Sequence, residues 1–317
     1  MDYLVTGGAG FIGSSLVNRL TNNNDNNVLV LDDLSMGNLD NLVEKENLKI
    51  IIGSVNDDNL LENIFQTNQF DYIFHLAAIA SVADSIERPL ETHKVNYDST
   101  LNIVELVKKY QKDLKRLVFA SSAAVYGDGQ EKIKDENSSI NPKSQYAVDK
   151  YASESTVLIA NNLYNINTTA VRFFNVYGPK QNPESPYSGV LSILFNELKK
   201  QKENKNGLFK IYGDGEQTRD FIFVEDVIDA LILVSNNEES LGEVYNVATG
   251  KTTSLNKIID TLNKLDEIQL PISYFEERIG DIKDSSANID KLKSLGFSPN
   301  FNIEQGLRQM VKYLLEV

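Results

Sequence analysis

Residues 2–13 read DYLVTGGAGFIG, a short apolar strand followed at once by a run of glycines. The apolar residues that come after this run recur at the spacing of a helix. A sharp turn from a strand into a helix aims free backbone N–H groups and the positive end of the helix at one point. The order of strand, glycine turn and helix therefore predicts a site for the pyrophosphate of a dinucleotide at Gly7, Gly10 and Gly13.

A second apolar strand, Val28–Leu31, ends at Asp32, about 20 residues beyond the last glycine. A carboxylate at this place would accept hydrogen bonds from the adenosine ribose and would repel a 2′-phosphate. Glycine turns also occur in unrelated βαβ units, but here the acid follows the turn at the expected distance. We therefore expect the cofactor to be NAD rather than NADP.

The composition excludes several classes of protein. The chain has 317 residues, enough for one large α/β unit or two domains. It has no Cys and only two His, His75 and His93, so neither a disulfide nor a His/Cys metal site is expected. The net charge of −14 argues against a nucleic-acid or membrane partner, and no apolar run approaches the roughly 18 residues of a membrane span. Because the first strand begins at residue 2, we expect no signal peptide and a cytoplasmic protein.

Strands and helices alternate through the first half, which predicts an α/β fold with a doubly wound parallel sheet of the Rossmann type. We expect an NAD-binding domain from residues 1–172 with about 220–248. A smaller C-terminal α/β domain from about 173–219 and 249–317 would bind the substrate. Two further strand-like runs, Phe221–Val224 and Val244–Val247, are expected to return to the large sheet. The other expected strands are 48–52, 72–76, 117–120 and 169–172, and the expected helices are 58–67, 93–111, 144–163, 188–202 and 225–235.

Tyr146 and Lys150 stand four residues apart in a stretch with helical character, which places both side chains on one face. With 14 Tyr in the chain, this spacing also arises by chance and needs independent support. Ser122 gives that support, because it ends an apolar strand, and the carboxyl ends of strands form the ligand crevice of an open α/β sheet.

Hydride transfer at a carbinol carbon needs a group that takes the hydroxyl proton. Tyr146 can do this as a phenolate, whose formation a nearby Lys150 ammonium and a nicotinamide cation would favour. Ser122 would hydrogen-bond the same substrate oxygen. In the alternative interpretation Tyr146 is a packed helix residue, Lys150 a solvated charge and Ser122 a strand cap. The glycine turn favours the catalytic interpretation.

Taken together, these residues resemble the extended short-chain dehydrogenase/reductases, and within them the UDP-glucose/UDP-N-acetylglucosamine 4-epimerases. The resemblance covers almost the whole chain and implies NAD, a UDP-hexose or UDP-N-acetylhexosamine substrate, and a homodimer formed through the helices near 93–111 and 144–163. The motifs that carry it are GGAGFIG at 7–13, Asp32-Asp33-Leu34-Ser35, His75-Leu76-Ala77-Ala78, Asn96, Ser121-Ser122 with Val125-Tyr126-Gly127, Tyr146 with Lys150, RFFNVYGP at 172–179, Gly213-Asp214-Gly215, Arg219-Asp220-Phe221, and Arg278 with Gly280-Asp281.

The resemblance also implies individual roles. Asn175 would contact the pyrophosphate, and Arg219 and Arg278 would clamp the UDP phosphates. Ser285, seven residues beyond Arg278, would lie beside the C2 substituent of the sugar, where a small residue leaves room for an N-acetyl group. The implied cofactor contacts are Gly7, Gly10, Phe11, Ile12, Gly13, Asp32, Ser35, Ser54, Val55, Leu76, Ala77, Ala78, Asn96, Tyr146 and Lys150. The implied substrate contacts are Ser122, Tyr146, Asn175, Tyr212, Arg219, Arg278, Asp281 and Ser285.

The chain departs from the family pattern at two places, Ser54 in place of an acid and Ser99 in place of a glycine. Directly after Ser122 it has Ala123-Ala124, where the 4,6-dehydratases that it resembles carry Asp-Glu and the decarboxylases a Glu. Methyl groups do no acid–base work, so epimerisation at C4 through a 4-keto sugar is the expected reaction, on UDP-N-acetylglucosamine and also UDP-glucose. A UDP-glucuronate 4-epimerase, a net dehydrogenase or 4-ketoreductase, and a nucleotide-sensing protein without activity stay open, although a sensor would need neither Tyr146 nor Lys150.

Overall fold

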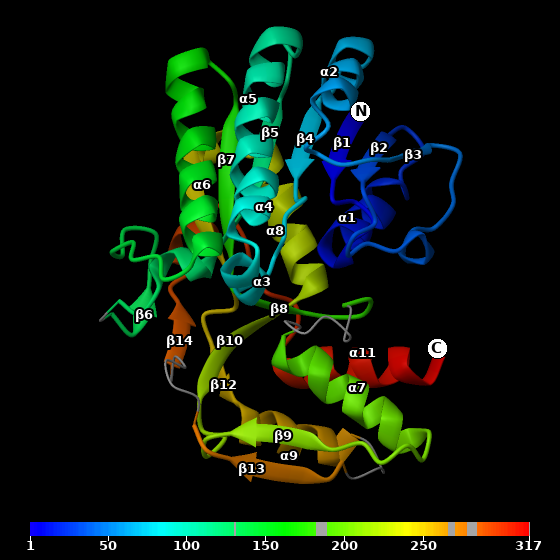
Figure 1. Ribbon diagram of the computed structural model, residues 1–317, viewed down its shortest axis with the longest axis vertical. Coiled ribbons are helices and arrows are strands. Elements are labelled where there is room, and N and C mark those ends of the chain that lie inside the picture. The colour runs from blue at the N-terminus through cyan, green and yellow to red at the C-terminus, as the bar shows by residue number, and fades with distance from the viewer. Residues whose placement is uncertain (130, 182–188, 266–269, 278–283, 317) are drawn as a thin grey trace.

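The computed structural model describes residues 1–129, 131–181, 189–265, 270–277 and 284–316. Its largest element is a seven-stranded sheet of order β11-β7-β5-β4-β1-β2-β3, in which every neighbouring pair is parallel (Figure 1). This arrangement confirms the predicted doubly wound sheet. The strands are β1 (Asp2–Thr6), β2 (Asn27–Asp32), β3 (Leu48–Ile52), β4 (Tyr72–His75), β5 (Arg116–Ser122), β7 (Thr168–Phe173) and β11 (Glu243–Val247).

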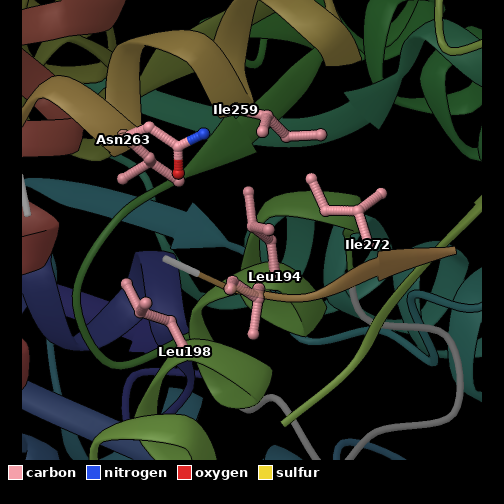
Figure 2. A pocket seen from close by; sticks show the side chains of 7 residues that line it. Leu194, Leu198, Ile259, Asn263 and Ile272 are labelled. Carbon is pink, nitrogen blue, oxygen red and sulfur yellow. The ribbon is translucent and has the colours of Figure 1, made fainter. Parts of the chain in front are cut away.

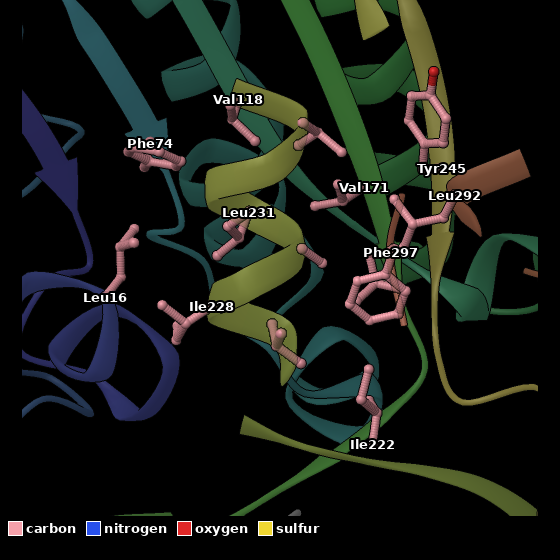
Figure 3. Packing of buried hydrophobic residues seen from close by; sticks show 14 of the residues in the cluster. Leu16, Phe74, Val118, Val171, Ile222, Ile228, Leu231, Tyr245, Leu292 and Phe297 are labelled. Atoms are coloured by element: carbon pink, nitrogen blue, oxygen red, sulfur yellow. The ribbon is translucent and has the colours of Figure 1, made fainter. Parts of the chain in front are cut away.

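Helices cover both faces of this sheet. On one face lie α1 (Phe11–Leu20) and α8 (Val224–Asn236), and on the other α2 (Asp58–Thr67), α5 (Ser99–Tyr110) and α6 (Gln145–Tyr164). The strands alternate between the two layers: Val5 of β1 packs with the first group of helices and its neighbour Leu4 with the second. Figure 3 shows α8 with Ile228 and Leu231 among the buried residues, and α8 packs against α1 on the same face of the sheet.

A second, smaller sheet lies beyond the carboxyl ends of the large one (Figure 1). Its order is β12-β10-β14-β6, and β8 pairs with the second half of β10. The expectation that Phe221–Val224 returns to the large sheet is therefore wrong, whereas Val244–Val247 does return, as part of β11. The strands of the smaller sheet are β6 (Ile133–Lys134), β8 (Asn175–Tyr177), β10 (Thr218–Phe223), β12 (Thr252–Ser254) and β14 (Asp284–Ala287).

Three helices and a two-stranded sheet complete the smaller lobe around a hydrophobic core of its own. Figure 2 shows a cavity in this core, about 10 Å³ in volume and lined mainly by Leu and Ile side chains. Since this volume holds one water molecule at most, the cavity is a packing defect and not a ligand site. The elements are α7 (Val190–Lys202), α9 (Leu255–Leu265), α11 (Ile303–Glu316), β9 (Phe209–Tyr212) and β13 (Ile272–Phe275).

The predicted helix at 93–111 is present and contains a π-helical turn. It consists of the end of α4 (Pro89–His93), one π-helical turn at Lys94–Asp98, and α5. The remaining short helices are α3 (Val82–Glu87), a 3₁₀ turn at Ala123–Tyr126, α10 (Asp290–Ser294) and 3₁₀ turns at Leu39–Asn41 and Glu238–Ser240. Within the described part of the chain, no helix combines the length and the apolar character needed to cross a bilayer.

Candidate active site

The structure brings together Ser122, Tyr146 and Lys150. Ser144 caps the start of α6, where its hydroxyl accepts a hydrogen bond from the Ala147 N–H at 3.2 Å, and so fixes where the first turn begins. One turn later the buried Lys150 Nζ donates to the carbonyl of Ala120 on β5 at 2.8 Å and lies 6.0 Å from the centre of the Tyr146 ring. Because Ser122 ends the same strand, α6 and β5 aim all three side chains at one edge of the sheet.

Burial governs the protonation of both titratable groups. It lowers the pKa of Lys150 to about 7, against a smaller opposing effect of the Asp149 carboxylate. It also raises the pKa of Tyr146 above 10, although a hydrogen bond with Ser122 acts in the opposite direction. The expectation that Lys150 lowers the pKa of this phenol stays a prediction, since burial sets the direction of the shift in the protein alone. An effect of the nicotinamide cation stays a prediction.

The glycines of the first turn serve two different purposes. Gly7 has φ +72°, and a Cβ there would lie 2.7 Å from the backbone N of Ala77, while a Cβ on Gly13 would lie 2.0 Å from the Gly7 carbonyl oxygen. Packing alone thus requires Gly7 and Gly13. A Cβ on Gly10 would meet only that carbonyl oxygen, at 3.3 Å, and Gly10 caps α1 without any side-chain hydrogen bond. The N-terminus of α1 therefore fits a phosphate that approaches the backbone at Gly10.

Asp32 lies where the ribose acceptor is expected and also organises the loops around it. It is 7% exposed, and its carboxylate accepts hydrogen bonds from the N–H groups of Ala9 at 2.9 Å and Leu34 at 2.8 Å. Each carboxylate oxygen keeps a second lone pair for a ribose hydroxyl. The nearby Ser35 is exposed, the hydroxyl of Ser54 accepts from the Asn56 N–H at 3.2 Å, and Val55 is buried.

The segment after β4, which contains Leu76, Ala77 and Ala78, is held by Asn96 from the π-helical turn. The buried amide of Asn96 accepts from the Ile79 N–H at 2.8 Å and donates to the Ile79 carbonyl at 3.1 Å. Asn96 therefore positions this segment through its backbone, which adds to its predicted role as a cofactor contact.

His75 at the end of β4 is buried between Thr6 and Thr100, whose hydroxyls lie 2.7 Å and 3.0 Å from its ring nitrogens. Burial lowers its pKa to about 3, helped by the charge of Lys150. A neutral ring that is enclosed in this way is a structural group and not a catalytic base.

The predicted substrate residues gather on the smaller lobe. Asn175 donates to the Asp220 carbonyl at 3.1 Å, and in the pairing of β10 with β14 Arg219 lies opposite Ser285. The Tyr212 ring at the end of β9 lies 5.7 Å from that of Phe275. Arg278 and Asp281 fall outside the described residues. Among those that are described, no group of three or more acidic or histidine side chains could hold a metal ion.

Sequence reasoning missed a buried polar network next to the candidate catalytic residues. Glu154, one turn after Lys150, forms an ion pair with Arg172 at 2.6 Å and accepts a hydrogen bond from the Ser121 hydroxyl at 2.6 Å. Tyr126 and Asn246 continue the network. A usable signal exists: Arg172 interrupts the apolar run of residues 170–173, and Glu154 extends the spacing of Tyr146 and Lys150 by a further turn.

Comparisons with known proteins agree with this geometry. Residues 3–248 match the family described as NAD dependent epimerase/dehydratase family. A UDP-glucose 4-epimerase of Mycolicibacterium smegmatis is 32% identical over 322 residues, which are 99% of this chain and 98% of that protein. Relatives at 29–30% identity include a sugar-nucleotide decarboxylase and 4,6-dehydratases.

Two solved structures each superpose with a TM-score of 0.91. A UDP-N-acetylglucosamine 4-epimerase from Methanobrevibacter ruminantium M1, in complex with UDP-N-acetylmuramic acid, is 36% identical, and the match covers 99% of this chain and 98% of the other. A UDP-glucose 4-epimerase from Thermotoga maritima, with UDP-glucose, is 34% identical and matches over 100% and 99%. The chain therefore belongs to the NAD dependent epimerase/dehydratase family, and NAD is its cofactor.

Proposed function

We propose that this protein is an NAD-dependent 4-epimerase of UDP-hexoses. The observation that carries the proposal is the pairing of the Ser122, Tyr146 and Lys150 constellation with Ala123 and Ala124 directly after the serine. Dehydration or decarboxylation needs further acid–base groups beside neighbouring carbons of the sugar. Two methyl groups at these positions leave one proton-transfer group, Tyr146, for chemistry at one carbon.

NAD supplies the group that takes the hydride from C4 and gives it back. Tyr146, as the phenolate that a bound nicotinamide cation would favour, receives the proton of the 4-hydroxyl and later returns it, while Ser122 hydrogen-bonds the same oxygen. Lys150 donates a hydrogen bond to the Ala120 carbonyl. This bond holds the Lys150 amino group 6.0 Å from the centre of the Tyr146 ring. For epimerisation the 4-keto sugar rotates between the oxidation and the reduction at C4, so that the hydride returns to the opposite face of the sugar.

The substrate that we propose is UDP-N-acetylglucosamine, interconverted with UDP-N-acetylgalactosamine, with UDP-glucose and UDP-galactose as further substrates. Arg219 offers a guanidinium for the pyrophosphate, and the half-buried Ser285 lies directly opposite it in the sheet. A serine beside the C2 position leaves the volume that an N-acetyl group needs. The similarity to the M. ruminantium UDP-N-acetylglucosamine 4-epimerase supports this choice.

The test is to incubate the protein separately with UDP-N-acetylglucosamine, UDP-glucose and UDP-glucuronate and to identify the products by NMR. We expect the C4 epimers of the first two, with NAD neither consumed nor released. A 4-keto-6-deoxy sugar or a pentose as product would replace the proposal with a dehydratase or a decarboxylase. Turnover of UDP-glucuronate alone would reassign the substrate.

Ser285→Tyr tests the N-acetyl assignment. Filling the space beside C2 should abolish activity on UDP-N-acetylgalactosamine and spare UDP-galactose, because only the first substrate carries the extra group. Ser285→Ala keeps the space and is the matched control. If the ratio of kcat/KM for the two substrates is the same in Ser285→Tyr and wild type, Ser285 does not select the substrate.

We also propose that the protein is a homodimer formed through α5 and α6. Apolar side chains lie exposed along these helices in the single chain, among them Leu101, Val148, Ile159 and Leu163, which is 63% exposed. Light scattering during gel filtration should give twice the chain mass for wild type and a single chain mass for Ile159→Glu. The matched change Ile52→Glu, on the exposed edge strand β3, should leave the dimer intact.

A further inference from the structure

The turn that follows Ser122 is held in place by hydrogen bonds of the buried Tyr126. Tyr126, in the 3₁₀ turn Ala123–Tyr126, is 1% exposed. Its hydroxyl donates to Oδ1 of Asn246 on β11 at 2.6 Å and accepts from Arg172 at 2.8 Å. Burial raises the pKa of this phenol to about 12, so the hydroxyl stays a donor at working pH.

Asn246 reaches from this turn to the smaller lobe. Its amide, fully buried, donates to the carbonyls of Lys134 on β6 at 3.0 Å and of Asn288 just after β14 at 3.3 Å. The backbone N–H of Asn246 donates to Glu136 at 2.7 Å, and the Asn288 N–H donates to the Lys134 carbonyl at 2.8 Å. One side chain thus ties β6 and β14 to the catalytic turn.

The same network reaches the catalytic helix at its other end. Arg172 donates from Nε and a terminal nitrogen to the two oxygens of Glu154, at 2.9 Å and 2.6 Å. Glu154 also accepts from Ser121, the residue before the catalytic serine. All these groups are buried, so losing one partner leaves another unsatisfied.

We propose that Tyr126 and Asn246 are positioning residues that hold β14, the strand of Ser285, in register with the turn after Ser122. In the proposed function the sugar binds between these two segments, so their register would set the distance from its C4 to Tyr146. The catalytic part of this inference rests on the proposed function, whereas the mechanical connection between β14 and the turn does not.

Tyr126→Phe is the first test, because it removes only the hydroxyl. The matched control is Tyr245→Phe on the same strand as Asn246, which removes a hydroxyl bonded to the Glu239 carbonyl, outside the network. Amide hydrogen exchange should be faster over residues 284–288 in Tyr126→Phe than in wild type and in the control. Asn246→Asp, which keeps the acceptor for Tyr126 but loses the donor to β6 and β14, should show the same change if it folds.

The kinetic test uses the same variants at 25 °C. In Tyr126→Phe we expect kcat to fall on the order of tenfold or more, while the NAD content and the Kd of UDP stay within about twofold of wild type. A purely structural role would lower the melting temperature and leave kcat unchanged, and that result would overturn the proposal. Unchanged exchange over 284–288 would overturn it as well. The exchange comparison remains decisive whichever sugar the wild type converts, so the two proposals can fail separately.

Discussion

Lys150→Met should make the protein more stable, and by an amount that depends strongly on pH. Burial lowers the pKa of Lys150 from 10.5 to about 7. At about 1.4 kcal/mol per pH unit, keeping the ammonium charged in the folded protein costs on the order of 5 kcal/mol. Methionine has similar length and no charge, so it escapes this cost and loses only the hydrogen bond to Ala120, worth about 1 kcal/mol at any pH.

The sign follows from which state binds the proton. In the unfolded chain the Lys150 amino group stays protonated up to pH 10.5, but in the folded protein it stays protonated only up to about pH 7. The cost is therefore complete below pH 7 and disappears as the pH rises towards 10.5. The gain in the free energy of unfolding from Lys150→Met should be larger near pH 6 than near pH 9.5, by about 3 kcal/mol.

Urea unfolding of nucleotide-free protein, followed by circular dichroism at both pH values, measures this difference. Lys49→Met on β3 is the control, since Lys49 is exposed and its ammonium already lies in solvent. The control should change stability by little at either pH. An equal gain for Lys150→Met at the two pH values, or a larger one near pH 9.5, would refute the assignment of Lys150 as a group whose charge is destabilised by burial. The variant should also lose activity.

Three further expectations concern single groups. Tyr146→Phe should keep the fold and the bound NAD but lose on the order of 10²–10⁴ in turnover, as measured by initial rates and NAD content. Gly10→Ala should leave the melting temperature nearly unchanged and weaken NAD binding in a direct titration, whereas Gly13→Ala, whose Cβ would lie 2.0 Å from the Gly7 oxygen, should destabilise the fold itself. Burial lowers the pKa of His75 from 6.5 to about 3, so the unfolded chain binds this proton first and stability falls as the pH drops from 6.5 towards 3; His75→Gln should make the fall in unfolding free energy shallower.

The large sheet could be predicted because its strands are short and mainly apolar, and because most of them alternate with helical patterns along the chain. The smaller sheet could not, because β6 has two residues and β8 and β12 have three each, too few for a periodic signal. For the same reason the local pattern of Phe221–Val224 does not predict the correct sheet. This pattern fits either sheet, and the choice depends on β8 and β14, which pair with the two halves of β10.

In the candidate site, too, contacts within one helix could be predicted and contacts between distant strands could not. Tyr146 and Lys150 are one helical turn apart, so their spacing in the sequence is also their spacing in space. Tyr126 and Asn246 are 120 positions apart and meet only because β5, β7 and β11 are neighbours in the sheet. Side chains whose partners are set by strand order have no local signature. The proximity of Tyr146 and Lys150 could therefore be predicted from the sequence, whereas the contact of Tyr126 with Asn246 could not.

Helix α6 shows why function and stability favour different residues at the same face. Lys150 and Glu154 are both buried, on a helix face that packs against β5 and would be cheaper to build from Leu and Ile. The Glu154 carboxylate accepts hydrogen bonds from Arg172 and Ser121, and these bonds offset the cost of burying its charge. The Lys150 amino group donates to a single carbonyl, that of Ala120. Its lowered pKa shows that this bond does not offset the whole cost of burying the charge. That cost falls on a residue that lies beside Tyr146, where the proposed mechanism uses a cation.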